Sequence, residues 1–317
     1  GIFILVFLFI LIFISLVIFF GFHKKNHSKN IKIYWLSKES SILINNWFMM
    51  YFLSVILIGT VYPIFLEVLS SEKISVGPPF YHKLIVPFLI PFLLFMSIGP
   101  NLNWIKSKIK KVKIEIIILF VISLSVSLLI SKKIGSENLI NIALISAAFY
   151  LFFITVKDFF SKKFKNYSQK ISHFGFSLLI LSILLNSIFS SEVIINLKVG
   201  EKFSFKKESI TFESIENTES KNYRSIIGHF KIQDKQKNSI QLKPELRIYE
   251  QPFTITSEAD IKTTLYYDKF LVMNLVKGNE YFNVRYQFKP FMIWIWISTL
   301  LLGIGGMFSL FKRIYEK

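Results

Sequence analysis

The chain has 317 residues, of which 52% are hydrophobic and 17% aromatic, and its mean hydropathy is +0.50. A water-soluble domain of this length keeps a largely polar exterior, so this composition excludes a soluble globular protein and makes lipid the expected solvent for most of the chain. The formal charge is +18 and cysteine is absent, which excludes disulfides, thiolate metal sites and thiol nucleophiles.

Seven apolar runs approach or reach the length that crosses a bilayer as a helix. In chain order they are residues 2–22, 42–66, 84–98, 114–131, 139–156, 172–189 and 291–311. The third is short and holds Pro87 and Pro91, which predict a kink. The chain opens directly on an apolar run, without the basic region and cleavage site of a signal peptide. We therefore expect a further portion upstream of Gly1.

The lysines form short clusters that follow the first, third, fifth and seventh spans. These clusters are Lys24, Lys25, Lys29, Lys32 and Lys38; Lys106, Lys108, Lys110, Lys111 and Lys113; Lys157, Lys162, Lys163, Lys165 and Lys170; and Lys312, Arg313 and Lys317. The intervening loops, 67–83 and 132–138, hold few positive charges. All clusters thus fall on one side of the membrane, which the positive-inside rule makes the cytoplasm or matrix. Topology explains the charge, and no nucleic-acid partner is expected.

The polar segment 192–289 departs from the membrane pattern and leaves the sixth span on the outer side. Its apolar residues alternate with polar ones, as in the run Phe282, Val284, Tyr286 and Phe288, whose intervening residues are Asn283, Arg285 and Gln287. The pairs Ile210 with Phe212 and Ile240 with Leu242 alternate likewise. This period of two predicts antiparallel strands with one buried face, separated by polar turns at 233–238 and 277–280.

The predicted fold class is therefore a polytopic α-helical membrane protein, with about seven transmembrane helices and a small β-rich outer-face domain. Its expected division is residues 1–190 for the first six transmembrane helices, 191–289 for the β-rich periplasmic or intermembrane-space domain, and 290–317 for the final transmembrane helix and basic inner tail. Membrane lipid is the expected environment of the helices.

His173 is the clearest polar group inside a predicted span, in the first turn of the sixth and near the inner face. A polar ring there is costly, so a functional role is the default hypothesis. Imidazole is the usual protein ligand of a membrane haem b, and Gly175 would let a flat ligand approach the backbone. The alternative is a histidine that reaches back to the interface. A second axial ligand would come from upstream of Gly1 or from a second copy.

The other histidines are weaker candidates. His23 and His27 lie in a lysine-rich loop, where solvation explains them. His82 lies on the outer loop beside Tyr81, and His229 is expected to face solvent from a strand. The segment 303–306, rich in glycine, indicates close helix packing. We find no residue pattern for hydrolysis or phosphoryl transfer, so the catalytic residues of this chain are unknown.

Several segments together resemble the CcmF family, the haem-lyase subunit of the System I cytochrome c maturation pathway. The signature is the run Ser75, Val76, Gly77, Pro78 and Pro79, preceded by the segments 40–46 and 59–63. The segments 98–100, 172–175, 222–223, 242–245, 258–261 and 288–296 continue the resemblance in the family's order. The similarity covers the chain from about residue 35 to its end and corresponds to the C-terminal half of the family.

The resemblance implies that His173 is an axial ligand of haem b, with its iron as the metal, and that the partner histidine lies in an absent N-terminal half. It implies an assembly that receives haem from a CcmE-type haem chaperone, works with a CcmH-type thiol-handling subunit, and attaches haem by thioether bonds to the CxxCH motif of apocytochrome c. The family's tryptophan-rich haem motif is absent from this sequence. We therefore expect a fragment or a naturally split subunit that is incomplete alone.

Two other functions stay open at this stage. One is a transporter of haem or another solute, which the proline-containing third span would suit. The other is a non-catalytic assembly scaffold that binds partners through the outer domain. The expected location is the bacterial inner membrane with the outer domain in the periplasm, or alternatively the mitochondrial inner membrane, because both have the same inside-positive pattern.

Overall fold

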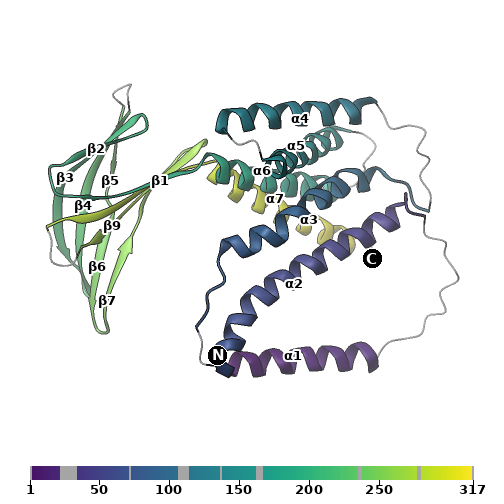
Figure 1. Ribbon diagram of the computed structural model, residues 1–317, viewed down its shortest axis with the longest axis horizontal. Coiled ribbons are helices and arrows are strands. Elements are labelled where there is room, and N and C mark those ends of the chain that lie inside the picture. Colours follow the sequence, from purple (N-terminus) through teal and green to yellow (C-terminus); the bar gives the residue numbers. More distant parts are fainter. Residues whose placement is uncertain are drawn as a thin grey trace. The chain divides into compact units, whose positions relative to one another are not determined.

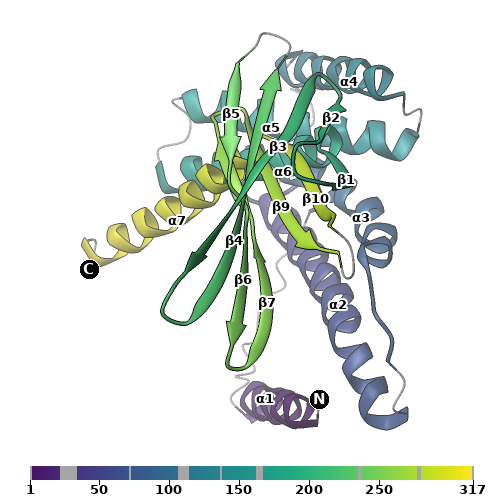
Figure 2. The same cartoon turned by 90° about the vertical axis from the view of Figure 1, so that its left-hand side faces the viewer.

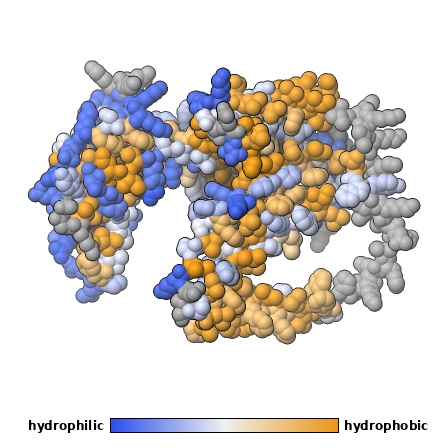
Figure 3. All heavy atoms as spheres, viewed as in Figure 1, coloured by the Kyte–Doolittle hydropathy of each residue, from blue (hydrophilic) through white to orange (hydrophobic). Residues whose placement is uncertain are grey.

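The structure is a computed structural model that describes residues 2–21, 34–70, 73–105, 114–135, 138–161, 167–234, 238–276 and 280–315. Within these ranges, seven helices are long and apolar enough to cross a membrane, and the remainder is mainly β-structure (Figure 1). Figure 3 shows hydrophobic residues over the helices and hydrophilic ones gathered over the strands. The predicted fold class is confirmed. His23, His27 and most of the predicted lysine clusters lie outside the described residues.

The chain forms two compact units, Gly1–Lys163 and Phe164–Lys317. The first unit is helical, and its elements are α1 (Ile2–Gly21), α2 (Lys38–Ser70), α3 (Pro78–Ile98), a short 3-10 turn η1 (Gly99–Asn101), α4 (Ile114–Ile134) and α5 (Leu139–Phe160). Helix α3 packs against α2 and α5, and α4 packs against α5. The proposed division of the chain at residues 190 and 289 stays a prediction.

Helix α3 is longer than the sequence predicts. It begins at Pro78 rather than at residue 84, and it continues through Pro87 and Pro91. Proline suits the first turn of a helix, where its missing N–H would have no intrahelical acceptor. The earlier start places Tyr81 and His82 inside the helix, so the prediction that His82 lies on a loop is wrong.

The second unit joins two helices to a β-sandwich. Its helices are α6 (Tyr167–Phe189) and α7 (Met292–Tyr315), and its strands are β1 (Ser191–Leu197), β2 (Lys202–Phe205), β3 (Glu208–Glu219), β4 (Tyr223–Asp234), β5 (Ser239–Leu242), β6 (Glu245–Glu250), β7 (Phe253–Glu258), β8 (Asp260–Thr263), β9 (Tyr267–Leu275) and β10 (Phe282–Pro290). One sheet has the order β1-β10-β9-β8, and the other has β2-β3-β4-β6-β7, with β5 paired to β4 (Figure 2).

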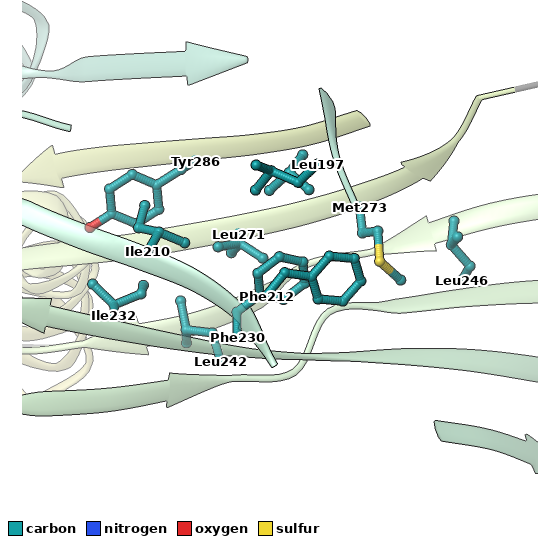
Figure 4. Close-up of a cluster of buried hydrophobic side chains, with 11 residues drawn as sticks. Leu197, Ile210, Phe212, Phe230, Ile232, Leu242, Leu246, Leu271, Met273 and Tyr286 are labelled. Carbon is teal, nitrogen blue, oxygen red and sulfur yellow. The ribbon is translucent and has the colours of Figure 1, made fainter. Parts of the chain in front are cut away.

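All of the strand pairs are antiparallel, and the predicted alternation sets their register. Val284 and Tyr286 of β10 are fully buried, as are Ile210 and Phe212 of β3. The rings of Phe212 and Phe230 stack at 4.2 Å between centroids, at the centre of the core in Figure 4. Arg285, on the opposite face of β10, forms an ion pair with Glu192 of β1 at 2.8 Å. The strand prediction for 282–288 is confirmed.

A charged pair closes one end of this apolar core. Lys269 of β9 has only 5% of its side chain exposed, and its Nζ lies 2.7 Å from Oε1 of Glu208 in β3. The Tyr286 hydroxyl donates to the other carboxylate oxygen, Oε2, at 2.6 Å. Burial is the main cause that raises the pKa of Tyr286, and the Glu208 carboxylate adds to it. These contacts join the two sheets, because β9 and β10 belong to one sheet and β3 to the other.

Removal of the Lys269 ammonium should destabilise the sandwich. Lys269→Met leaves the partly buried Glu208 carboxylate without its cation, which costs about 3 kcal/mol for a pair of this kind. The measurement is hydrogen–deuterium exchange of the β9 and β10 amides in the full chain. Lys262→Met, at the exposed position opposite Lys269 on β8, is the matched control and should change exchange little. Equal protection in the two variants would contradict the role of the pair.

Asp268 predicts a pH dependence in the same region. Its side chain is 5% exposed and its Oδ1 atom has no hydrogen-bond partner within the described chain. Desolvation by burial raises the pKa of this carboxyl, partly offset by a hydrogen bond from Thr263. A raised carboxyl pKa means that folding favours the protonated form, so this group's contribution to stability is lost as pH rises through the acidic range.

Asp268→Asn should therefore stabilise the sandwich at neutral pH, by about 1 kcal/mol, and should flatten that part of the pH dependence. Exchange protection of β9 measured from acidic to neutral pH checks this. A variant that is less stable than the original chain at neutral pH, with an unchanged pH slope, would refute the assignment.

Candidate functional site

Helices α6 and α7 approach each other through glycines. A Cβ atom added at Gly175 of α6 would lie 3.1 Å from the Ser298 carbonyl oxygen and 3.1 Å from the Leu302 nitrogen of α7. A Cβ atom at Gly305 of α7 would lie 2.9 Å from the Ser172 nitrogen. These are backbone atoms that cannot move aside. In lipid, where apolar burial does not drive helices together, such small residues permit the close packing that holds a pair.

Hydrogen bonds fix both ends of this α6–α7 contact. Near one end, the Ser168 hydroxyl donates to the Gly305 carbonyl oxygen at 2.7 Å. At the other, the Asn186 side-chain nitrogen donates to the Pro290 carbonyl oxygen at 2.6 Å. In an apolar seam such hydrogen bonds satisfy polar groups that would otherwise lack a partner, and each adds on the order of 0.6 kcal/mol to the association of spanning helices. Helix α6 is therefore fixed along its length.

The glycines do not act as the sequence suggests. Gly175 was expected to admit a flat ligand, but α7 backbone occupies that space, so that expectation is wrong. The packing role predicted for the segment 303–306 is confirmed at Gly305 alone, since a Cβ at Gly303 or Gly306 would meet nothing within 4 Å.

His173 lies on the other side of α6. Among the α6 residues that contact α7 or the strand leading into it are Ser168, Ser172, Gly175 and Asn186, and at roughly 100° per residue these four form one stripe along the helix. The same rotation places His173 roughly opposite that stripe. The helix begins at Tyr167, so His173 is in its second turn and not its first. Its side chain is partly buried.

This geometry suits a single imidazole donor better than a site built wholly by this chain. The described residues contain no group of three or more His, Cys, Asp and Glu side chains that would hold a metal ion. A neutral imidazole on a rigid, apolar helix can coordinate a haem iron without bringing a charge into the membrane. The histidine is compatible with a ligand role, and a six-coordinate iron would need one further donor.

The signature Ser75, Val76, Gly77, Pro78 and Pro79 forms the entry to α3. Residues 73–77 lie outside any helix or strand, Gly77 is the N-cap with an extended backbone, and the two prolines occupy the first turn. This entry directs Tyr81 onto α2, where its hydroxyl would lie 2.6 Å from a Cβ added at Gly59. Tyr81 lies two residues after the signature, so the start of α3 is packed against the segment 59–63, which also carries the family resemblance.

A second pair of these segments meets at the opposite ends of α2 and α3. The Ser41 side chain fills the space beside Gly99, where no Cβ atom would fit. The Glu39 carboxylate accepts from the Ile105 backbone N–H at 3.0 Å, and the Lys38 N–H donates to the Asn103 carbonyl oxygen at 3.0 Å. The sequence does not predict these contacts, and its only signal for them is the presence of small residues in the apolar runs.

The sandwich holds two further polar features. His229 faces outward as predicted, and its Nε2 lies 3.0 Å from the Glu216 carboxylate. An open hollow at the tips of the β3–β4 and β6–β7 hairpins is lined by Glu219, Ser220, Lys221, Asn222, Tyr223, Arg224, Glu250 and Gln251. Arg224 and Glu250 pair across it. Its mixed charges do not define a ligand class.

The helices and the sandwich define the class of protein: a polytopic membrane protein whose last two helices carry an extramembrane β-sandwich between them. Comparison with known proteins shows which members of this class the chain resembles. A family model described as the CcmF C-terminal beta-sandwich matches residues 188–290. Cytochrome c-type biogenesis protein CcmF of Pseudomonas fluorescens is 27% identical over 329 residues, which is 100% of this chain and 50% of that protein. CcmF of Escherichia coli K12 is 26% identical, with the same coverage of 100% and 50%.

A solved structure named cytochrome c heme lyase CcmF has the same fold, with a TM-score of 0.68 at 18% identity. The match covers 87% of this chain and 46% of that one. The resemblance to the C-terminal half of CcmF is confirmed by these matches. The chain spans about half the length of the curated relatives it matches.

The α6–α7 contact makes a direct prediction. Gly305→Ala should push the helices apart and destabilise the pair by about 1–3 kcal/mol, as overpacking does. Gly303→Ala is the matched control two residues away, where a Cβ meets open space, and it should have no such effect. Thermal unfolding of the full chain in detergent measures both. An equal change in the two variants would show that close approach at Gly305 does not support the contact.

Proposed function

We propose that this chain is the C-terminal part of a haem lyase that acts in cytochrome c biogenesis. The observation that carries the proposal is the match along the whole chain to CcmF proteins. His173 lies on α6 roughly opposite the stripe that contacts α7 and is the proposed ligand. The complete assembly would take haem from a CcmE-type chaperone and form thioether bonds with the CxxCH thiols of apocytochrome c.

In this proposal His173 would hold a haem b through its imidazole. The chain's own contribution is to keep that imidazole at a fixed position and depth. Ser168, Gly175 and Asn186 lock α6 against α7 on the side away from the ring. A ligand side chain supported by such a rigid element keeps its geometry. When bound, haem b would supply electron transfer that keeps the iron of the incoming haem reduced.

The second axial ligand is proposed to come from the part of the assembly that this chain does not include, either an N-terminal half or a separate subunit. His82 is a poor alternative, because it is exposed near the start of α3. The family's tryptophan-rich haem motif is proposed to lie in the same missing part. This chain would then hold the haem b side of the machinery, and the attachment chemistry would be completed elsewhere.

The sandwich is proposed as the contact surface for the haem chaperone and the CcmH-type thiol-handling subunit. The basic clusters predict an inner side for the helix ends that carry them, which puts the sandwich in the periplasm of a bacterium or in the intermembrane space of a mitochondrion. The membrane would be the bacterial inner membrane or, as the alternative, the mitochondrial one. The rival view is that the sandwich only stabilises the helices.

A spectrum of the purified full assembly tests the ligand assignment. His173→Ala should abolish the b-type signal in the reduced-minus-oxidised difference spectrum while protein level stays unchanged, because the iron loses an axial nitrogen. The controls are His82→Ala and His229→Ala, which remove an exposed and an ion-paired histidine and should keep the signal.

A second variant separates ligation from a structural role. His173→Gly leaves a space that free imidazole can enter, so added imidazole should restore the b-type signal if the ring binds iron. A transporter or a scaffold without haem predicts no b-type signal in any of these proteins. An unchanged spectrum in His173→Ala would refute the assignment.

A further inference from the structure

The turn between β8 and β9 is tied to the start of α7. The Trp294 indole Nε1 donates to the Leu265 carbonyl oxygen at 3.0 Å. The Phe291 backbone N–H donates to the Tyr266 carbonyl oxygen at 2.9 Å. Two successive residues of the turn are thus hydrogen-bonded to the residues on either side of Met292, where the helix begins.

The turn is also rigid in itself. The Thr264 hydroxyl donates to the Tyr267 carbonyl oxygen at 2.7 Å, and the Thr264 N–H donates to the same oxygen at 3.0 Å. The Tyr267 N–H in turn lies 3.1 Å from the Thr264 hydroxyl oxygen. Hydroxyl-to-backbone bonds of this kind fix a tight turn. These bonds hold the turn in one conformation. Because Leu265 and Tyr266 are bonded to Trp294 and Phe291, the turn also has a defined position relative to α7.

The side chains at the tip are apolar and exposed. Leu265 is 49% exposed and Tyr266 is 67% exposed, and the turn sequence Thr264-Leu265-Tyr266-Tyr267 holds no charge. On α7, Trp296 is 63% and Leu300 67% exposed. Leu, Tyr and Trp at the end of a spanning helix are the residues that enter the boundary between acyl chains and headgroups, because each combines apolar surface with, in Tyr and Trp, a polar edge.

We propose that the β8–β9 turn is a membrane anchor that inserts Leu265 and Tyr266 into the lipid interface. Helix α7 is apolar enough to span a membrane, so its first turn lies at the edge of the hydrocarbon region. A turn within hydrogen-bond distance of that first turn lies at the same depth. The exposed tip of the turn is therefore in contact with phospholipid. The anchor fixes the sandwich to the membrane at a further point, besides the two chain connections through β1 and β10.

The inference rests on α7 as a membrane span and is independent of haem binding at His173. Because the chain has no cysteine, single-cysteine variants can be labelled at one site. The variants are Leu265→Cys, Tyr266→Cys and the matched control Phe253→Cys. Phe253 is 74% exposed on the β6–β7 hairpin, which extends away from the start of α7 in both Figure 1 and Figure 2.

Each variant of the full chain is labelled with an environment-sensitive fluorophore in phosphatidylcholine nanodiscs. Quenching by nitroxide-labelled lipid should be several-fold stronger at positions 265 and 266 than at 253, and quenching by aqueous iodide should show the reverse order. Iodide quenching at 265 and 266 equal to that at 253 would place the turn in water and overturn the proposal. Protection from both quenchers would mean that protein covers the turn, which also overturns it.

A measurement on the unmodified chain guards against variants that disturb the turn. A photoactivatable phosphatidylcholine is cross-linked to the chain in nanodiscs, and the labelled peptides are mapped by mass spectrometry. Adducts on the peptide that contains residues 264–267 support the anchor. Adducts confined to the spanning helices would contradict it.

Discussion

The close approach of α6 and α7 at Gly175 and Gly305 is the constraint on which the second unit depends. Neither glycine can carry a Cβ without meeting the backbone of the other helix. The contact sets the spacing of the two strands that continue the helices, because β1 follows α6 and β10 leads into α7, and these strands pair as an antiparallel ladder. The α6–α7 helix pair therefore continues directly into the β1–β10 strand pair, without a flexible linker between them. The same contact leaves His173 on the side of α6 that faces away from α7.

The sandwich solves a different problem, because its two sheets face water. Hydrophobic burial supplies most of its stability: eleven side chains, including Phe212, Phe230 and Tyr286, form one buried cluster. The Lys269–Glu208 pair adds little net energy by comparison, since desolvation offsets much of the attraction. Its contribution is positional. An ammonium, a carboxylate and a phenol that satisfy one another admit only one alignment of the two sheets.

The segments that carry the resemblance to CcmF serve mainly as packing devices where the structure describes them. Gly59 receives Tyr81, Gly99 receives Ser41, and Gly305 receives Ser172. A motif of small residues and prolines is therefore explained by helix contacts before any chemistry is invoked. His173 differs, because a polar ring within a span has no packing advantage over an apolar side chain of similar size. That contrast, together with the similarity to CcmF, is the basis for proposing it as a haem ligand.

The sequence by itself predicted the seven apolar spans, the strand at 282–288 and the resemblance to CcmF. Runs of about 20 apolar residues are dictated by bilayer thickness, and alternation in 282–288 is dictated by the pleat of a half-buried strand. Only the tertiary structure decided that α3 begins at Pro78, that Gly175 meets a helix and not a ligand, and that Lys269 is buried. The reason for the last two is that each depends on a neighbour distant in the chain: α7 for Gly175 and β3 for Lys269. Periodicity specifies which face of an element is apolar, but the identity of the residue that covers that face is set by the fold.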